Sequence, residues 1–254
     1  MKVRKYKRKK KTKPFYKRKF FWLSFLGVVL FLGLIYFFLF SPIFEIKQIK
    51  AQGCDFLDCS QLEKIVESQR RILFFTTNNI FLFNRKKSEA KLAKSFLPIK
   101  EVVAKRKLPN KLLLEVVERK PKAQVCFEDS CFMIDKTGFA FRKNEDASEL
   151  LSICVDRDIS LGSNLLSTEI LNIILEIEQN LNDKTILKTK CYYILEDKIK
   201  VTLKDYNFSL YFSKEKDVAL QVSDLELLLK NKFPEEQFGD LDYIDLRFDK
   251  IFLK

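Results

Sequence analysis

The sequence of 254 residues contains no histidine, and this absence excludes several classes of catalysis. Without histidine there is no Ser-His-Asp triad, no Cys-His pair and no imidazole ligand for a metal. Glycine is also scarce, with six residues, and none of them belongs to a glycine-rich loop of the kind that holds phosphate. We therefore expect a protein without a cofactor and without a small-molecule substrate.

Acidic residues are missing from residues 1–19, and charge of either sign is missing from residues 20–41. The first segment holds twelve Lys and Arg residues, which leaves the rest of the chain nearly neutral, with 35 basic and 34 acidic residues. A nucleic-acid-binding protein needs a basic face on its folded part. We expect no nucleic-acid partner, and we interpret residues 1–19 as a cytoplasmic tail that is attracted to anionic lipid.

Residues 20–40 form an uninterrupted apolar run that predicts a transmembrane helix. As a helix this run is about 30 Å long, which is the thickness of a bilayer core. Trp22 and Tyr36 lie near its two ends, as interfacial anchors do. A cleaved signal peptide is the alternative, but residues 38–43 lack the small residues that mark a cleavage site. We expect an uncleaved single-pass anchor, with residues 42–254 on the extracytoplasmic side.

The part that follows the anchor divides into two modules, the first over residues 42–119 and the second over residues 120–254. The pattern of the first module is strand, helix, helix, strand, strand: residues 44–50, a helix from Ser60, a helix from Asn84 or Ser88 that ends before Pro98, residues 99–107 and residues 111–118. Ser60 and Glu63 fit a capping box, in which each side chain accepts a free amide at a helix start. This order predicts a small α+β unit with two helices on one sheet.

The second module reads as a mixed β domain with two packed helices, ending in an edge strand. Seven short strands are expected at residues 123–127, 131–134, 139–142, 151–155, 187–195, 198–203 and 208–212. Apolar residues at helical spacing predict helices at about residues 168–181 and 217–232.

All six cysteines follow the anchor, so they face a space where thiols can pair: Cys54, Cys59, Cys126, Cys131, Cys154 and Cys191. Cys126 and Cys131 flank a four-residue hairpin connection, which places them opposite each other at disulfide distance. Cys54 and Cys59 bracket a short loop and could also pair. Free core thiols, or a four-cysteine zinc site with unusually long spacing, are the alternatives. We expect no metal, and the pairing stays open because sequence does not determine it.

Two segments match the Ser-x-x-Lys pattern of penicillin-binding enzymes, Ser88 to Lys91 and Ser213 to Lys216. Both lie at expected helix starts, where a capping Ser is the ordinary explanation. The companion motifs do not occur together with either segment. We therefore expect no enzymatic activity.

Three motifs follow the anchor in order, at residues 106–121, 134–141 and 243–248. Together they resemble the FtsQ/DivIB family of bacterial cell-division proteins. Residues 106–121 (RKLPNKLLLEVVERKP) are similar to the signature that closes the POTRA domain of that family: an Arg before a Pro, alternating apolar residues, then Glu-Arg-x-Pro. Residues 134–141 (IDKTGFAF) resemble its Ile-Asp-x-x-Gly-x-x-Phe turn, and residues 243–248 (YIDLRF) resemble its Ile-Asp-Leu-Arg strand. The order of tail, anchor, POTRA domain and β domain also fits the family.

The resemblance implies a bitopic scaffold of the divisome, located at the division septum, which gathers FtsB- and FtsL-like single-span proteins and helps to control septal peptidoglycan synthesis. In the family, the last strand of the β domain takes up a partner segment as an added strand. Carried onto this chain, the expected partner-binding residues are Tyr243, Asp245, Arg247, Phe248, Ile251 and Phe252. By alternation we expect Ile244, Leu246 and Phe248 to face inward, and Tyr243, Asp245 and Arg247 to face outward. The alternation slips at residues 250–251, after which residues 251–253 are expected to continue the edge.

Two other functions are compatible with the same sequence. One is a membrane-anchored cell-wall processing enzyme with a degenerate site, which muropeptide hydrolysis would reveal. The other is a POTRA-bearing export accessory, which would bind unrelated extended chains comparably.

Overall fold

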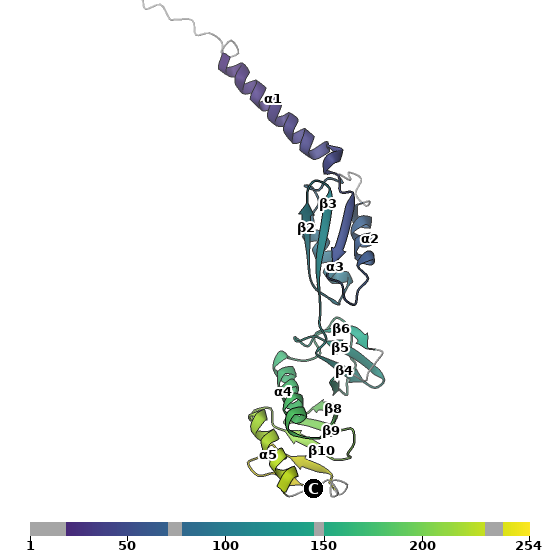
Figure 1. Ribbon diagram of the computed structural model, residues 1–254, viewed down its shortest axis with the longest axis vertical. Helices are drawn as coiled ribbons and strands as arrows, with labels where there is room; N and C mark the ends of the chain where they lie inside the picture. Colours follow the sequence, from purple (N-terminus) through teal and green to yellow (C-terminus); the bar gives the residue numbers. More distant parts are fainter. Residues whose placement is uncertain (1–18, 71–77, 145–149, 232–240) are drawn as a thin grey trace, which may run out of the picture. The chain divides into compact units, whose positions relative to one another are not determined.

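The computed structural model describes residues 19–70, 78–144, 150–231 and 241–254. The chain divides into two compact units (Figure 1), the first formed by residues up to Leu92 together with Val102–Val116, and the second by Ala93–Glu101 together with Val117–Lys254. All but the last residue of the expected basic tail 1–19 lies outside the described residues.

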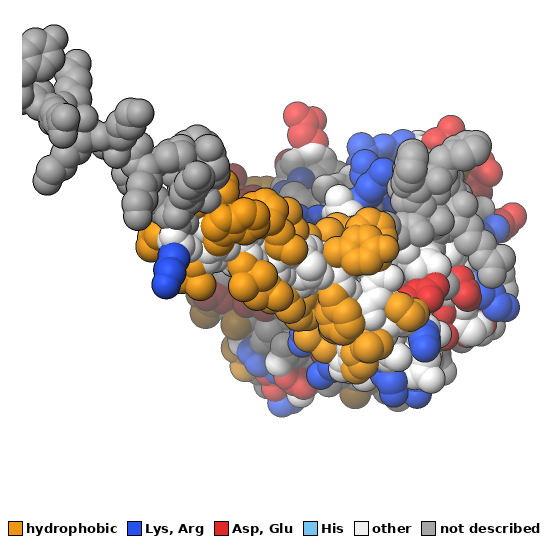
Figure 2. Space-filling model, turned by 90° about the horizontal axis from the view of Figure 1, so that it is seen from above, with side chains coloured by type: hydrophobic (Ala, Val, Ile, Leu, Met, Phe, Trp, Pro, Cys, Tyr) orange, Lys and Arg blue, Asp and Glu red, His pale blue; other side chains and the backbone are white. Residues whose placement is uncertain are grey.

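The first unit begins with the long helix α1 (Lys19–Phe40), followed by the short 3-10 helix η2 (Pro42–Phe44). None of the side chains of α1 is buried, although the helix is apolar on all sides. Orange hydrophobic side chains cover the face of this helix that is seen in Figure 2. Exposure of this much apolar surface to water is unfavourable, because none of it is removed from water by packing within the protein. Such a helix is stable in the apolar core of a lipid bilayer.

A three-stranded sheet and two helices make up most of the remainder of the first unit, and only the end of α3, the start of β2 and the end of β3 are grouped with the second unit. Its elements are β1 (Gln48–Gln52), α2 (Cys59–Arg70), α3 (Arg85–Ser95), β2 (Ile99–Lys107) and β3 (Lys111–Glu118). The strand order is β1-β3-β2, with β1 parallel to β3. The predicted βααββ order and the α+β class are confirmed, and the apolar face of β3 supplies Leu112, Leu114 and Val116 to the core. The first strand begins later than predicted, because residues 42–44 form η2 instead.

The predicted capping box at Ser60 and Glu63 is wrong, because Asp58 caps α2. The Oδ1 atom of Asp58 accepts the backbone N–H of Ser60 at 2.9 Å, and Oδ2 accepts its hydroxyl at 2.8 Å. The hydrogen bonds from Ser60 hold the pKa of Asp58 below its ordinary value. Glu63 turns away from the helix start and accepts the backbone N–H of Ala51 in β1 at 2.8 Å.

The second unit is built on a nine-stranded mixed sheet. Its strands are β4 (Ala123–Phe127), β5 (Ser130–Ile134), β6 (Ala140–Asn144), β7 (Ser152–Cys154), β8 (Thr189–Ile194), β9 (Ile199–Leu203), β10 (Ser209–Phe212), β11 (Tyr243–Asp245) and β12 (Phe252–Leu253). The spatial order is β12-β11-β10-β9-β8-β7-β4-β5-β6. Two helices, α4 (Thr168–Lys184) and α5 (Val218–Asn231), pack against each other beside this sheet (Figure 1).

One core joins the helices to one face of this second sheet. In α4 the buried side chains recur at helical spacing, at Leu171, Ile174, Ile177 and Leu181. In β9 every second residue, Ile199, Val201 and Leu203, is buried in this core, because successive side chains of a strand point to opposite faces of the sheet. The hydroxyl of Ser167 accepts the N–H of Ile170 and fixes the start of α4.

Candidate functional site

The candidate site lies at one edge of the nine-stranded sheet, where β11 and β12 form the last two positions. β11 runs parallel to β10, and β12 folds back antiparallel onto β11, pairing Ile244 with Leu253 and Asp245 with Phe252. The edge strand is therefore β12 and not β11. The sequence prediction of one strand over residues 243–248 was wrong in its length, because β11 ends at Asp245.

The orientations that were expected along this segment hold in part. Ile244 and Leu246 are buried, with relative exposures of 0% and 2%. Phe248, which was expected to face inward, is 51% exposed, and Asp245, which was expected to face outward, is 5% exposed. The expected orientation fails at Phe248 because the strand ends after Asp245, and a period of two applies only within a strand. Asp245 lies inside β11, and its buried carboxylate is paired with Arg247. Ile251 is half-buried against the core.

A buried ion pair explains why β11 stops where it does. Nε of Arg247 donates to Oδ1 of Asp245 at 3.0 Å, and Nη2 donates to Oδ2 at 2.8 Å. The backbone N–H of Arg247 bonds the same Oδ1 at 3.1 Å, so the carboxylate draws the chain out of extended geometry. Nη1 of Arg247 also donates to Asp197, in the segment between β8 and β9.

The charges in this cluster stabilise each other. Burial by itself raises the pKa of Asp245, but the hydrogen bonds and the positive charge of Arg247 outweigh it and hold that pKa below its ordinary value. The hydrogen bonds to Asp245 raise the pKa of Arg247 in return. Both groups are therefore ionised at neutral pH, and they act as a fixed brace rather than as an acid or a base.

Exposed apolar side chains surround this brace. The rings of Phe248 and Phe252 meet edge to face, with centroids 5.6 Å apart, and both side chains are about half exposed. Phe248 also borders a hollow of about 300 Å³ that Leu220 and Gln221 of α5 line on its other side. The tyrosine rings of Tyr211 and Tyr243 stack nearby at 5.2 Å. An exposed aromatic cluster of this kind is typical of a protein-binding surface.

The two edges of the first sheet are closed in the same way. Glu63 of α2 accepts the N–H of Ala51 on the outer side of β1, and Glu89 of α3 accepts the N–H of Ala104 on the outer side of β2, both at 2.8 Å. Each helix thus occupies an amide that an added strand would need.

The two edges of the second sheet differ in the charge of their exposed side chains. β6 presents the exposed side chains of Arg142 and Lys143, and charged residues discourage strand addition. β12 presents Phe252 and Leu253, which carry no charge. Among the sheet edges that the structure describes, β12 is therefore the one that combines an uncharged strand with exposed aromatic neighbours.

A comparison with family models finds one match, over residues 44–119, to the POTRA domain of the FtsQ type. Residues 44–119 form a POTRA domain of the FtsQ type. The match covers the three-stranded sheet with α2 and α3, and α1 precedes it as the membrane anchor does in that arrangement. No curated protein matches the chain.

Two of the three motifs that carry the FtsQ/DivIB resemblance meet in the second unit, at Arg119 and Asp135. Nη1 of Arg119 pairs with Oδ2 of Asp135 at 2.5 Å, and Nε of Arg119 donates to the carbonyl of Leu97 at 3.1 Å. The guanidinium also lies over the ring of Phe139, 4.3 Å from its centroid. Gly138 has φ +78°, and a Cβ there would meet the carbonyl oxygen of Leu166 at 2.2 Å, so the turn requires glycine. The Glu-Arg-x-Pro and Ile-Asp-x-x-Gly motifs are thus joined by one ion pair.

The structure contains one helix, among the described residues, that is long and apolar enough to span a membrane, Lys19–Phe40. An FtsQ/DivIB-like protein with such a helix before its POTRA domain has the organisation of a single-pass membrane protein.

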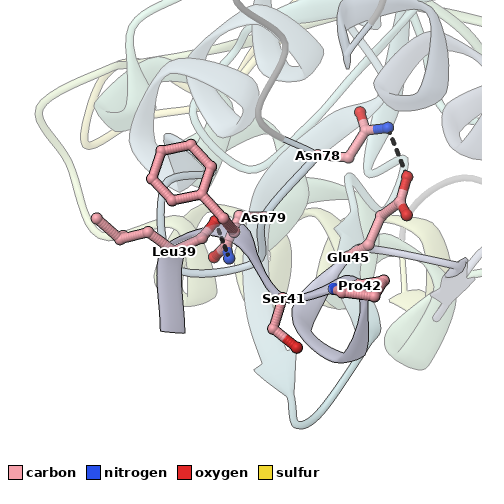
Figure 3. A pocket seen from close by; sticks show the side chains of 7 residues that line it. Leu39, Ser41, Pro42, Glu45, Asn78 and Asn79 are labelled. Carbon is pink, nitrogen blue, oxygen red and sulfur yellow. Dashed lines mark hydrogen bonds between the residues drawn. The ribbon is translucent and has the colours of Figure 1, made fainter. Parts of the chain in front are cut away.

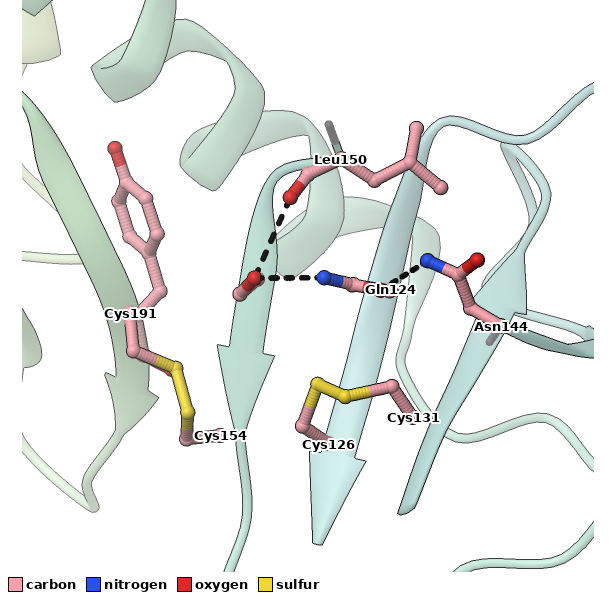
Figure 4. The surroundings of a disulfide bond; sticks show 9 residues. Gln124, Cys126, Cys131, Asn144, Leu150, Cys154 and Cys191 are labelled. Atoms are coloured by element: carbon pink, nitrogen blue, oxygen red, sulfur yellow. Dashed lines mark hydrogen bonds between the residues drawn. A yellow bond between two sulfur atoms is a disulfide. The ribbon is translucent and has the colours of Figure 1, made fainter. Parts of the chain in front are cut away.

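Three disulfides use all six cysteines, Cys54–Cys59, Cys126–Cys131 and Cys154–Cys191. The last pair was not foreseen, because its members are 37 residues apart and only the adjacency of β7 and β8 brings them together. Cys126 and Cys154 are register partners, so four cysteines lie in a row across β5, β4, β7 and β8 (Figure 4).

A row of polar side chains runs beside these cysteines. Nε2 of Gln124 donates to Oγ of Ser152 at 2.9 Å, and Nδ2 of Asn144 donates to Oε1 of Gln124 at 2.6 Å (Figure 4). The middle of the sheet is therefore tied together by covalent bonds and by buried hydrogen bonds.

The Ser-x-x-Lys segments do not form a site that resembles a nucleophile and its base. Oγ of Ser213 accepts the backbone amides of Glu215 and Lys216, as a turn or cap residue does, while Nζ of Lys216 pairs with Asp249. Ser88 is buried in α3, whereas Lys91 is exposed. No group of three or more Cys, Asp or Glu residues that could hold a metal occurs within the described part of the chain.

Proposed function

We propose that this protein is a membrane-anchored, non-catalytic scaffold of the bacterial divisome that captures an extended partner segment at the open edge of β12. The observation that carries the proposal is the difference among the four sheet edges. Helix glutamates occupy amides of β1 and β2, and charges mark β6, while β12 is uncharged and lies beside exposed Phe248 and Phe252.

The hydrogen-bond pattern of β12 leaves groups available for a further strand. Lys254 and Tyr243 exchange two backbone hydrogen bonds, at 3.1 and 3.3 Å, so this is a bonded pair of the antiparallel ladder. Bonded and non-bonded pairs alternate, and the N–H and C=O of Leu253 therefore face away from β11. A partner strand would pair with Leu253 and would bring its side chains against Phe248 and Phe252.

The partners that the FtsQ/DivIB likeness favours are FtsB- and FtsL-like single-span proteins, and the place of action is the division septum, where the assembly would help to control septal peptidoglycan synthesis. The N-terminus would be cytoplasmic and residues 42–254 extracytoplasmic. Three disulfides support that side, because disulfides persist in oxidising compartments.

The experiment measures capture of the extracytoplasmic segments of the FtsB- and FtsL-like proteins of the same cell by the full chain in detergent. Leu253→Pro removes the outward N–H and Leu253→Ala keeps it, so only the proline variant should lose the hydrogen bond, a loss of about two- to tenfold in affinity. Phe248→Ala combined with Phe252→Ala should weaken capture by at least about tenfold, because exposed aromatic anchors dominate such interfaces.

Other outcomes separate the alternative functions. Equal capture by Leu253→Pro and Leu253→Ala would contradict strand addition. Comparable binding of unrelated extended peptides would indicate an export accessory, and hydrolysis of muropeptides by the full chain would indicate an enzyme. A fluorescently tagged chain that fails to concentrate at midcell would contradict the divisome role.

A further inference from the structure

The last turn of α1 is hydrogen-bonded to a loop of the POTRA domain. Nδ2 of Asn79 donates to the carbonyl oxygen of Leu39 at 2.9 Å (Figure 3). The same atom donates to the carbonyl oxygen of Phe38 at 2.7 Å. The final carbonyls of a helix have no partner within the helix, and Asn79 therefore completes the end of α1. Oδ1 of the same side chain accepts the N–H of Phe81 at 2.8 Å, so one buried residue joins the helix end to the turn that follows it.

Three aromatic rings reinforce this connection. The ring of Phe81 lies 6.1 Å from that of Phe38 and 5.2 Å from that of Phe44, and the rings of Phe38 and Phe44 are 5.3 Å apart. Phe38 belongs to the apolar helix itself. Phe81 must therefore lie at the depth of the last helical turn, which is the depth of the membrane surface when α1 spans the bilayer.

Further apolar side chains at this end of the first unit are exposed. Ile43 of η2 is 51% exposed and Leu82 is 49% exposed, and each is next to a member of the aromatic group. The turn that carries Leu108, which is 60% exposed, lies nearby, because the N–H of Lys47 bonds the carbonyl of Asn110 at 2.9 Å. Segments from three parts of the sequence thus present apolar residues where α1 leaves the domain.

Basic side chains border these apolar residues. α3 begins with the exposed residues Arg85, Lys86 and Lys87 and has no acid in its first turn. Basic residues are unfavourable at a helix N-terminus, where the helix dipole is positive, unless an external anion is present. Arg106 donates to the carbonyls of Phe81 and Phe83, at 2.9 and 3.0 Å, which holds its charge against the same loop.

Among the described residues, the nearby Glu45 and Glu89 form hydrogen bonds with neutral groups and no ion pair with residues 85–87. Glu45 accepts a hydrogen bond from Nδ2 of Asn78, and Glu89 accepts the N–H of Ala104. Burial, together with the smaller effect of the charge of Arg85, lowers the pKa of Arg106.

We propose that this end of the POTRA domain is a second membrane contact, in which Phe81, Leu82 and Ile43 enter the bilayer interface and residues 85–87 bind the phosphates of anionic lipids. Apolar residues flanked by Lys and Arg are typical of interfacial membrane contacts. The occupant is a lipid surface because the patch is continuous with the helix that enters the bilayer. This contact requires α1 to span the membrane, but it does not depend on partner capture at β12.

The test uses the single tryptophan of the chain. In a Trp22→Phe background, the full protein carries Leu82→Trp or, as a matched control, Val103→Trp, and is reconstituted in vesicles of phosphatidylcholine with phosphatidylglycerol. Val103 is an exposed apolar residue of β2, about 13 Å along the strand from the turn at its end. Lipids brominated on the acyl chains should quench the tryptophan at position 82 severalfold more than the one at position 103, and acrylamide should show the opposite order.

A second pair of variants tests the charge. Lys86→Glu with Lys87→Glu should abolish the dependence of quenching at position 82 on phosphatidylglycerol. Lys91→Glu with Lys94→Glu, which makes the same charge change later in α3, should leave it intact. Hydrogen exchange over β3 verifies folding in each variant. Acrylamide access at position 82 without quenching by brominated lipid overturns the proposal. Protection of the tryptophan at position 82 from acrylamide that increases with the number of protein molecules per vesicle, without quenching by brominated lipid, also overturns the proposal. That result would identify a second copy of the chain as the occupant.

Discussion

The two units of this protein protect their sheets by different means. In the first unit, Glu63 and Glu89 each reach from a helix to an amide on an outer strand. The disulfide Cys54–Cys59 joins the loop before α2 to the first residue of that helix, outside the sheet. In the second unit two disulfides lie within the sheet, and its edge at β12 has no such carboxylate among the described residues. The second unit is therefore stabilised by disulfides inside its sheet, while its edge at β12 stays available for an added strand.

Removal of a disulfide should cause the greatest loss of stability, and the loss should differ between the disulfides. Replacing Cys154 and Cys191 by Ala should lower the free energy of unfolding of the second unit by about 4 kcal/mol, because this bond closes a long loop. Replacing Cys54 and Cys59 by Ala should cost the first unit about 2 kcal/mol, because that loop is short. Hydrogen exchange, read on peptides of each unit in the full chain, measures both.

The pair Cys126 and Cys131 is the matched control for that measurement. It lies in the same sheet as Cys154–Cys191 but has the same sequence separation as Cys54–Cys59. Its removal should cost about 2 kcal/mol if loop length decides the effect. A cost as large as that of Cys154–Cys191 would show that position in the sheet decides instead.

The next effect concerns the two Arg–Asp pairs of the second unit. Arg247→Ala should cost about 3 kcal/mol, because Asp245 is left buried with one backbone hydrogen bond. Combining Asp245→Asn with Arg247→Ala should restore much of the stability that Arg247→Ala loses. Arg119→Ala should cost less, about 1–2 kcal/mol, because Asp135 keeps its hydrogen bonds from Thr137 and Phe139.

Acid titration of the wild-type chain tests the same pairs. The pKa of Asp135 and that of Asp245 are both lowered in the folded state, by hydrogen bonds that outweigh burial. Their stabilisation is therefore complete above the unfolded pKa of about 4 and is lost as the pH falls through the folded values. Urea midpoints should drop in that window, and less so in Asp245→Asn. An unchanged drop in that variant would refute the assignment.

The smallest effect concerns the closed edges of the first sheet. Glu63→Ala and Glu89→Ala should each cost about 1 kcal/mol and should speed hydrogen exchange at Ala51 and Ala104 respectively. Lys64→Ala, on the exposed side of α2, is the control. If both glutamate variants leave these amides protected, the carboxylates do not close the edges, and the contrast with β12 disappears.

The structure also changes how the candidate edge should be probed. From the sequence, Arg247 and Phe248 were both expected to bind a partner, but Arg247 is a structural brace of Asp245 and its removal would destabilise the fold. Phe248 and Phe252 are exposed, and they report on binding without that complication.

Local patterns in the sequence determined most of the secondary structure. The apolar run gave α1, the alternation gave β2, β3 and β4 at their observed bounds, and the spacing of apolar residues gave α4 and α5. These features depend on neighbours along the chain, and so the sequence carries them directly. The motif that contains Arg119 also indicated the POTRA domain correctly, although not that Arg119 forms an ion pair with Asp135.

Tertiary structure alone decided which strand became the edge, where β11 ended and which cysteines met. Cys154 and Cys191 pair because β7 lies beside β8, and Arg247 ends β11 because Asp245 is buried. The disulfide depends on strands that are distant in sequence but adjacent in the sheet, whereas the contact of Arg247 with Asp245 is local and the burial of Asp245 is tertiary. Which strands pair in a sheet depends on which apolar surfaces are buried against each other in the whole fold, and no local pattern of residues determines that pairing.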